Sequence, residues 1–469
     1  MESRDEKSIS FLNSDIINDD FFIDIVERKL KITRDEFKLR LVFISPATGK
    51  NENYASVVYR AKISIEINES KERKFVNVII KALLITIEEM KEFAIFEREI
   101  VVYEKVIGSY EELLAEKTNE IVEFGPKCLN VISKPYEIIV LEDLKATGYE
   151  MLDRKVGVNF DQAKLVVEKL AKFHAASAVC YQKDGQVSNQ LDRLEMLKTE
   201  AMSSPDQFKK SAFAFGLMFQ EFVKSASTIE GCEKISTKLA QWDMMRIFGV
   251  FMAVAEPMTC GFKVLNHGDD WLNNMLFKSD ENGKTIDVKF IDFQMSFWGS
   301  PANDLIYFFV SSIADDIKTK HYDDLIEIYH SKLVECLKAL VYDQHIPTLS
   351  ELQIDLIEKS SAFGFHMMFV LFIAKYDSND DLDIEQIMNP DKVNYKVIYD
   401  AFNNEIYKNA LKTWLPFLNK RGYLDTLLPH APATPFMQAI MQQMAQAAGG
   451  GNTSEAPQMV NGQMHNSEN

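Results

Sequence analysis

Two short polar strings in the second half of the chain carry residue types that could do metal-assisted chemistry. The first reads HGDDWLNN over residues 267–274, and the second reads IDFQ over residues 291–294. Between them, two apolar runs flank Asn282-Gly283, a pair that strongly favours a β-hairpin turn. The two strings are therefore predicted at the open end of one hairpin.

The geometry of this hairpin predicts that three oxygen-bearing side chains converge. Counting outward from the turn, Asp292 falls opposite Asn274 to within one position, and Asp269 lies on the loop that leads into the same end. Two carboxylates and an amide oxygen are hard ligands. Mg²⁺ takes such ligands while it keeps several waters and shares the phosphates of a substrate.

The two strings together resemble the catalytic core of the protein-kinase-like phosphotransferases. In that class an H-x-D-x-x-x-x-N string supplies a general base and a metal ligand, and an Asp of the D-F-G type supplies the main metal ligand. Either string alone is a weak signal. Both strings joined by a hairpin of suitable length are a much stronger one.

Such a phosphotransferase also needs a lysine for the phosphates, and Lys81 fits this role. It is the one charge inside the predicted strand 75–84, which reads FVNVIIKALL. Its acidic partner is expected on the following helix, where we choose Glu99. Glu97 and Glu104 are alternatives, but their helical phase differs from that of the neighbouring apolar stripe. The alternative for Lys81 is a structural one, in which a lysine at the edge of the strand extends its ammonium to water.

Two further stretches are candidates for nucleotide contacts. The loop at 48–56 reads TGKNENYAS, and its backbone N–H groups could hold phosphate oxygens together with the side chains of Asn53 and Ser56. The strand YEIIVLE ends where two lobes would join. Backbone groups at this connection are candidates for adenine contacts: Leu141, Glu142, Asp143 and Leu144.

Hydrophobic periodicity predicts the elements that must position these residues. Residues 56–67 alternate between apolar and polar, which predicts a strand with one buried face, and residues 75–84 form its hairpin partner. Residues 136–142 are a further strand. Helical patterns cover several stretches: 20–30, 86–107, 160–179 and most of 303–425.

These patterns predict an α+β, bilobal, protein-kinase-like fold with a small β-rich N-lobe and a large, mostly helical C-lobe. We expect a helical lead-in, a nucleotide-binding lobe, a lobe with the catalytic and acceptor-binding residues, and a disordered tail, in that order: 1–34, 35–144, 145–430 and 431–469. The tail has no Lys or Arg and contains a Gly-Gly-Gly break. Such a composition buries too little apolar surface to fold.

A wider set of motifs makes the resemblance more specific. Together with Lys81, the strings NENYASVVYR, FEREIVVY, VLEDL, LAKFHA, HGDDW, IDFQ and SPANDLIYF resemble the ecdysteroid kinase-like family, which carries the CHK kinase-like domain and is related to choline and aminoglycoside kinases. The resemblance covers about residues 35–425. It implies ATP-dependent phosphorylation of a small-molecule hydroxyl, with ATP and Mg²⁺ as cofactors. It also implies Asp269 as the catalytic base and Asn274 and Asp292 as Mg²⁺ ligands.

Several residues near these strings have a structural interpretation beside a functional one. His267 is expected to brace the catalytic loop rather than carry a proton. Asp304 is expected to accept hydrogen bonds from that loop, with a helix N-cap as the alternative. His174 is expected to be a packed helix histidine, and Asp270 to be solvated or to support a neighbour. Three aromatic features could line an acceptor pocket or belong to the core: Trp271, Trp298 and residues 363–369.

Composition restricts the class of protein. The chain has 469 residues with 52 Lys and Arg, 70 Asp and Glu, and a net charge of −18. This charge argues against a nucleic-acid binder and against attraction to an anionic membrane surface. Five isolated cysteines indicate a reducing compartment, and we see neither a secretory signal nor a membrane span. We therefore expect a cytoplasmic protein with no obligate protein partner.

Three functions are compatible with these observations. The first is a kinase, an alcohol-group phosphotransferase that acts on a steroid-like or xenobiotic alcohol. The second is a choline- or ethanolamine-type amino-alcohol kinase, whose cationic acceptor the negative charge would attract. The third is a non-catalytic ligand-binding protein on a kinase-like scaffold. The presence of the complete set of site residues argues against the third function. The acceptor and the oligomeric state stay open.

Overall fold

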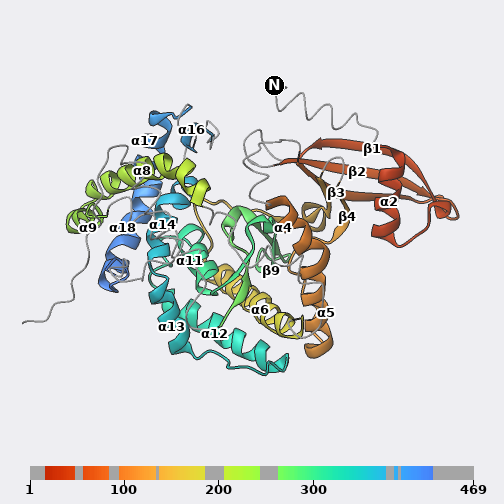
Figure 1. Cartoon of the computed structure of the whole chain (residues 1–469). Coiled ribbons are helices and arrows are strands. Elements are labelled where there is room, and N and C mark those ends of the chain that lie inside the picture. Colours follow the sequence, from red (N-terminus) through yellow and green to blue (C-terminus); the bar gives the residue numbers. More distant parts are fainter. Residues whose placement is uncertain are drawn as a thin grey trace, which may run out of the picture. The chain divides into compact units, whose positions relative to one another are not determined.

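An antiparallel sheet occupies the N-terminal part of the chain, and helices make up most of the C-terminal part (Figure 1). This is the α+β, kinase-like organisation that the sequence predicts. The computed structural model describes residues 16–47, 56–83, 95–133, 137–184, 205–242, 262–376, 385–388 and 392–425. The predictions for residues 48–55, which include Asn53, for residues 86–94 and for the tail 431–469 lie outside these residues. The domain boundaries stay predictions.

Five strands form the N-terminal sheet in the order β1-β2-β3-β5-β4. Their bounds are β1 (Phe37–Pro46), β2 (Val57–Ile67), β3 (Arg73–Leu83), β4 (Cys128–Ile132) and β5 (Glu137–Glu142). The predicted hairpin of β2 and β3 is confirmed, with Val57 opposite Ala82. The edge strands β1 and β4 are not predicted from the sequence, because neither has a regular alternation of buried and exposed residues.

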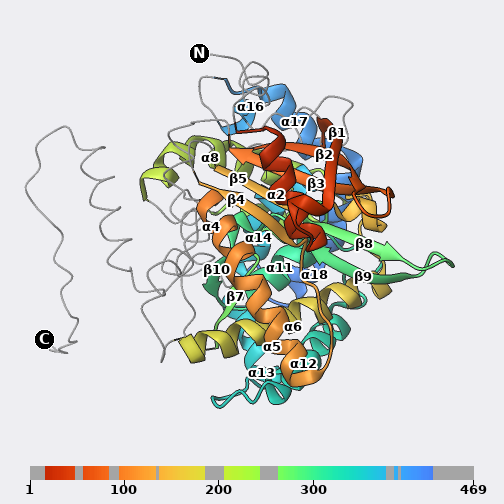
Figure 2. The same cartoon turned by 90° about the vertical axis from the view of Figure 1, so that its right-hand side faces the viewer.

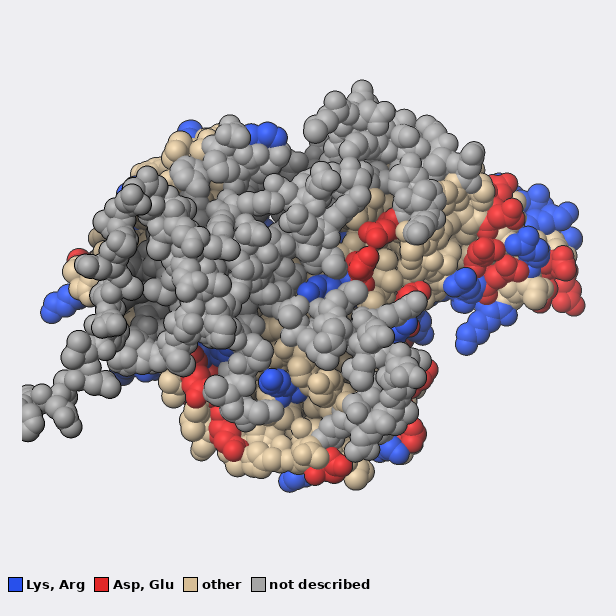
Figure 3. All heavy atoms as spheres, in the orientation of Figure 1, with Lys and Arg blue, Asp and Glu red and all other residues tan. Residues whose placement is uncertain are grey.

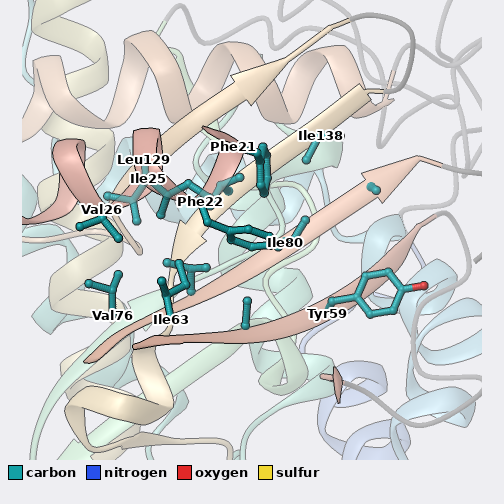
Figure 4. Packing of buried hydrophobic residues seen from close by; sticks show 14 of the residues in the cluster. Phe21, Phe22, Ile25, Val26, Tyr59, Ile63, Val76, Ile80, Leu129 and Ile138 are labelled. Carbon is teal, nitrogen blue, oxygen red and sulfur yellow. The ribbon is translucent and has the colours of Figure 1, made fainter. Parts of the chain in front are cut away.

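The helix α2 (Asp19–Leu30) packs on one face of this sheet (Figure 4). The Asn18 side chain caps its N-terminus by accepting a hydrogen bond from the N–H of Phe21. Four buried side chains of α2 share a hydrophobic core with the sheet: Phe21, Phe22, Ile25 and Val26. Each contributes roughly 1.5–3 kcal/mol by its burial. The helix expected as a lead-in is therefore part of the core of the sheet.

The alternation of side chains along β3 directs Lys81 to the opposite face of the sheet. Its neighbours Ile80 and Ala82 belong to the core beneath α2, and successive side chains of a strand point to opposite faces. A helix of three segments follows β3 in the described chain: α4 (Ile95–Val101), the π-helical η2 (Val102–Val106) and α5 (Ile107–Thr118).

Long helices form the framework of the C-terminal part. The helix α6 (Phe160–Asp184) packs against both α12 (Tyr322–Ala339) and α5, as both views show (Figure 1, Figure 2). The remaining helices of this part are α8 (Pro205–Ser227), α9 (Glu233–Leu239), α11 (Ala302–Ser311), α13 (Leu349–Glu358), α14 (Ser361–Phe369), α15 (Leu371–Ala374), α16 (Glu385–Met388), α17 (Tyr395–Asn403) and α18 (Glu405–Lys420).

Two small sheets hold the chemistry-bearing strings. The predicted hairpin is formed by β8 (Met275–Ser279) and β9 (Thr285–Phe290), with β6 (Tyr149–Glu150) beside β8. The strand β7 (Val264–Asn266) leads into the HGDDWLNN string, and β10 (Phe297–Gly299) follows the IDFQ string. Because β7 and β10 pair with each other, the two strings are held together at both ends.

The described residues show no single-sign charged surface in Figure 3, no membrane-spanning helix and no disulfide. Acidic and basic side chains lie interspersed over the coloured part of Figure 3. Within the described ranges, no helix combines the length and apolar character that crossing a membrane requires. None of the four cysteines in these ranges forms a disulfide: Cys128, Cys180, Cys232 and Cys336.

The helix α12 ends in a conformation that its sequence fits poorly. Val341 follows the helix with a φ of 60°. Its N–H donates to Lys338 O, and the N–H of Tyr342 donates to Leu337 O, which is the hydrogen-bond pattern of a Schellman motif. This position favours glycine, because a β-branched residue in the left-handed region is strained. The valine side chain is 76% exposed, so its burial does not offset the strain.

We predict that Val341→Gly increases the free energy of unfolding by about 1 kcal/mol, the usual scale of the left-handed penalty less the entropy that glycine adds to the unfolded chain. Urea unfolding of both proteins measures this difference. Val341→Ala is the matched control, and it should gain less because it keeps a Cβ. A glycine variant less stable than the wild type would contradict the assignment of strain.

Candidate functional site

The ammonium of Lys81 lies between two carboxylates. Its Nζ is 2.6 Å from Glu99 Oε2 and 2.8 Å from Asp292 Oδ1. Burial alone would lower the pKa of Lys81, but the charges of Asp292 and Glu99 outweigh it and raise that pKa. Burial also raises the pKa of Glu99 to about 7, against the effect of Lys81. The ion pair expected between Lys81 and Glu99 is thus present, whereas Glu97 and Glu104 are exposed.

The helix that carries Glu99 is tied to the segment after β9. Arg98 Nη1 donates to Ser296 O at 3.0 Å. The N–H of Asp292 faces the hydroxyl oxygen of Tyr103 at 3.4 Å, and the Tyr103 ring meets Phe293 edge-on with centroids 5.4 Å apart. Sequence reasoning assigns no contact to Tyr103. Its place on the same buried helix stripe as Glu99 is the signal that could have identified it.

Along most of its length the hairpin has the register expected from a turn at Asn282-Gly283, and Asp292 follows one position beyond the residue opposite Asn274. Met275 pairs with Phe290, and the N–H of Ile291 donates to Asn274 O at 2.9 Å, so Asn274 lies opposite Ile291 rather than Asp292. The turn is longer than a two-residue loop, and the register shifts between Lys278 and Ser279. Asp292 itself leaves the strand in a left-handed conformation with φ 65° and ψ 62°.

Asp269 is held by two side chains. Its Oδ1 accepts from the hydroxyl of Tyr307 at 2.5 Å, and its Oδ2 accepts from Asn274 Nδ2 at 2.9 Å. Burial, with the negative charge of Asp292, raises the pKa of Asp269 to about 7. Tyr307 is not among the site residues predicted from the sequence. It stands three residues after Asp304 on α11, and that spacing places both on one helix face.

The amide of Asn274 presents its oxygen as the free ligand atom. Its Nδ2 donates both to Asp269 Oδ2 and to the Asp269 backbone carbonyl at 2.8 Å. Asp292 uses Oδ1 for Lys81, which leaves Oδ2. These two hard oxygen donors fit Mg²⁺ that completes its shell with phosphates and water. Among the residues described, no group of three or more His, Cys, Asp or Glu side chains is placed to hold a metal ion.

Asp304 supports the turn that precedes Asp269. Its carboxylate accepts from the backbone N–H of His267 at 2.7 Å and of Gly268 at 2.9 Å. His174 Nε2, 3.1 Å away, donates to the same carboxylate because a carboxylate can only accept. Asp304 therefore contacts the catalytic loop as expected. The alternative of an N-cap is wrong, because Pro301 occupies that position.

His267 and Gly268 fix the path of this loop. His267 is buried, and its Nε2 donates to Ile291 O at 3.0 Å. Burial lowers the pKa of His267, which suits a neutral structural imidazole. Gly268 has a φ of 79°, and a Cβ there would lie 2.2 Å from Met295 O. Only glycine fits this position, since the backbone of the next segment passes directly over it.

The side chains at the end of β5 form ion pairs. Glu142 Oε1 pairs with Lys29 of α2 at 2.5 Å. Asp143 pairs with Arg60 Nε of β2 at 2.6 Å. Both carboxylates are thus committed to holding β5 in place. The predicted nucleotide role of this segment stays a prediction for the backbone.

Two backbone N–H groups of this segment already donate hydrogen bonds within the protein. The N–H of Glu142 donates to Lys127 O at 2.9 Å, and that of Asp143 donates to Asn77 O at 3.3 Å. The short helix η3 (Leu144–Thr147) opens at Leu144, and the first N–H of a helix has no acceptor within the helix. A nucleotide contact here would therefore use carbonyl groups and the N–H of Leu144.

The other predicted residues are placed as follows. Ser56 is buried immediately before β2, and its contact with phosphate stays a prediction. Trp298 stacks on Tyr181 of α6 with centroids 4.3 Å apart, and Trp271 is half-buried before η5 (Leu272–Asn274). Within residues 363–369, Phe363 packs against Trp414 in the helical core.

The fold and the site together define a kinase-like protein. A family model with the description "ecdysteroid kinase-like family" matches residues 50–342, which is more than half of the chain. The chain therefore belongs to the ecdysteroid kinase-like family, as the sequence motifs indicate. The matched range contains every residue described above around Lys81 and Asp269. A search of the curated proteins gives no match to the chain.

Asp270 lies beside the site without a partner. It is fully buried, and no hydrogen-bond partner is found for either carboxylate oxygen among the described residues. The expectation of a solvated side chain is therefore wrong. Burial, reinforced by the charge of Asp304, raises the pKa of Asp270 well above its ordinary value.

We predict that Asp270→Asn stabilises the chain more as the pH rises. The folded chain keeps a proton on Asp270 at pH values where the unfolded chain, with an ordinary pKa of 3.8, has released it. Folding stability therefore falls with rising pH, by at most about 1.4 kcal/mol per pH unit, and the variant lacks this loss. Urea unfolding at pH 5, 6.5 and 8 measures the difference in the free energy of unfolding between the variant and the wild type. If this difference does not change with pH, Asp270 is ionised in the folded chain and the prediction is wrong.

Proposed function

We propose that this protein is an ATP-dependent small-molecule kinase that phosphorylates a hydroxyl of a steroid-like or xenobiotic alcohol. One observation carries the proposal. Residues from β3, α4, the loop after β7 and the turn after β9 meet in one charged constellation, in which Lys81 bridges Glu99 and Asp292 while Asp269 binds Asn274. Membership of a kinase-like family supports the same conclusion.

The phosphate end of the site is built around Lys81. Its ammonium is held by Glu99 and Asp292, and the raised pKa keeps it charged at neutral pH. A fixed, charged donor is what the β- and γ-phosphates of a nucleotide require. Asn274 and Asp292 would hold Mg²⁺ through the oxygens that their other contacts leave available. Bound there, Mg²⁺ would neutralise negative charge on the phosphate oxygens.

The acceptor end is built around Asp269. As the acceptor oxygen forms a bond to the γ-phosphorus, the bond from that phosphorus to the oxygen of the departing ADP breaks, and the hydroxyl proton passes to Asp269. Tyr307 and Asn274 each donate to a different carboxylate oxygen of Asp269. These two bonds orient the carboxylate, so we assign Tyr307 as a positioning residue for the base.

We predict that Asp269→Asn lowers kcat by at least ~10² while Mg·ATP affinity changes only a few-fold, because removal of a general base typically costs ~10²–10⁴ in rate. An ATP-consumption screen over sterols, plant phenolics and amino-alcohols, with mass spectrometry of the products, first identifies an acceptor. Steady-state kinetics on that acceptor then gives kcat for each variant, and calorimetry gives the affinity for Mg·ATP.

The matched control is Asp270→Asn, one residue further along the same loop. Its buried carboxyl makes no hydrogen bond to a described residue, so the loss in kcat should stay below about tenfold, less than a general base contributes. A larger loss at Asp270 than at Asp269 would contradict the assigned base. If the wild type transfers phosphate to no compound in the screen, the non-catalytic scaffold becomes the better account.

A further inference from the structure

His366 of α14 is a buried histidine whose imidazole has an unmet hydrogen bond. The residue is 4% exposed, and within the described part of the chain its Nδ1 has no hydrogen-bond partner. Burying a polar group without a partner costs on the order of 1–3 kcal/mol. Burial lowers the pKa of His366 to about 3, so the ring is neutral and offers one donor and one acceptor.

The position of His366 connects it to the proposed base. Its ring lies 4.5 Å from the ring of Tyr307, centroid to centroid, with an interplanar angle of 50°. The hydroxyl of Tyr307 in turn donates to Asp269 Oδ1 at 2.5 Å. One tyrosine therefore separates the unmet imidazole from the carboxylate that would receive the proton of the acceptor.

Several apolar neighbours of His366 on α14 have packing contacts. Phe363 contacts Trp414 of α18, and Phe365 stacks on Phe369. Gly364 lies against the ring of Trp242, where a Cβ would be 3.1 Å away. The helix has two polar side chains, Ser361 and His366, and the imidazole of His366 lies against the ring of Tyr307.

We propose that Tyr307 and His366 form part of the acceptor site, with the imidazole of His366 hydrogen-bonded to a second polar group of the acceptor. This inference rests on the proposed function, because it takes Asp269 as the base that defines the acceptor end. The class of ligand follows from the chemistry of the two side chains. The neutral imidazole has one hydrogen-bond donor and one acceptor, so it suits an alcohol with a further hydroxyl or carbonyl oxygen. A quaternary ammonium has neither an N–H nor a lone pair and cannot form this hydrogen bond.

The first test measures the stability of the ligand-free protein. His366→Leu removes the unmet polar group, so the melting temperature should stay the same or rise. The matched control is His330→Leu, because His330 Nε2 has a partner in Pro347 O at 2.9 Å, and losing that bond should lower the melting temperature. If His366→Leu lowers the melting temperature as much as His330→Leu does, His366 has a packing role and the proposal is overturned.

The second test measures binding in the Asp269→Asn background, which should bind an acceptor without phosphorylating it. The probes are ecdysone as a polyhydroxylated steroid, cholesterol as a steroid with one hydroxyl, and choline. His366→Leu should weaken binding of ecdysone about tenfold, the loss of one hydrogen bond, and His366→Gln should restore part of it. Equal affinities of both proteins for ecdysone, or stronger binding of choline than of ecdysone, would overturn the proposal.

The two proposals fail in different ways. If ecdysone binding depends on His366 while the wild type transfers no phosphate to it, the acceptor site stands and the kinase function fails for that ligand. If the wild type phosphorylates ecdysone and His366→Leu leaves its KM unchanged, the kinase function stands and the acceptor site is wrong. The KM for ATP should be the same in both proteins, since His366 lies at the acceptor end.

Discussion

A buried ammonium needs a counter-charge, and Lys81 obtains two from segments that are far apart in the sequence. Glu99 comes from α4 and Asp292 from the turn after β9. Breaking a buried pair by removing one partner leaves an uncompensated charge, which costs about 3–5 kcal/mol. The sheet, the helix that follows it and the catalytic segments are therefore fixed to one another at this point. In the proposed function, the same contact would place a cation beside the phosphates of the nucleotide.

Asp304 has the corresponding role beneath the catalytic loop. Its carboxylate accepts from two successive backbone N–H groups of the loop and from His174 of α6. The loop thereby presents Asp269 towards Tyr307 and Asn274, while Asp270 is buried with no hydrogen-bond partner among the residues that the structure describes. The buried polar groups of Asp270 and His366 lower the stability of the fold. Asp270 is the residue after Asp269, and His366 lies against Tyr307. Proteins commonly keep such unfavourable groups near sites that need them.

Much of this arrangement could be predicted from sequence, because the signals are local. The alternation in β2 and β3, the strings around Asp269 and Asp292, and the helix phase of Glu99 require only short-range patterns. The rest depends on contacts that spacing does not encode. The edge strands β1 and β4 lack regular alternation, and no local pattern indicates that Asp270 is buried or that Tyr307 donates to Asp269.

The affinity for Mg·ATP, measured by calorimetry, tests the central role of Lys81 most directly. Lys81→Met should weaken binding at least about tenfold, since a charge-assisted hydrogen bond contributes about 1.5–3 kcal/mol. The matched control is Lys62→Met, because Lys62 lies on the neighbouring strand β2 over the ring of Phe75 and should leave the affinity unchanged. Circular dichroism checks that both variants are folded. A folded Lys81→Met protein that binds Mg·ATP as tightly as the wild type would contradict the account.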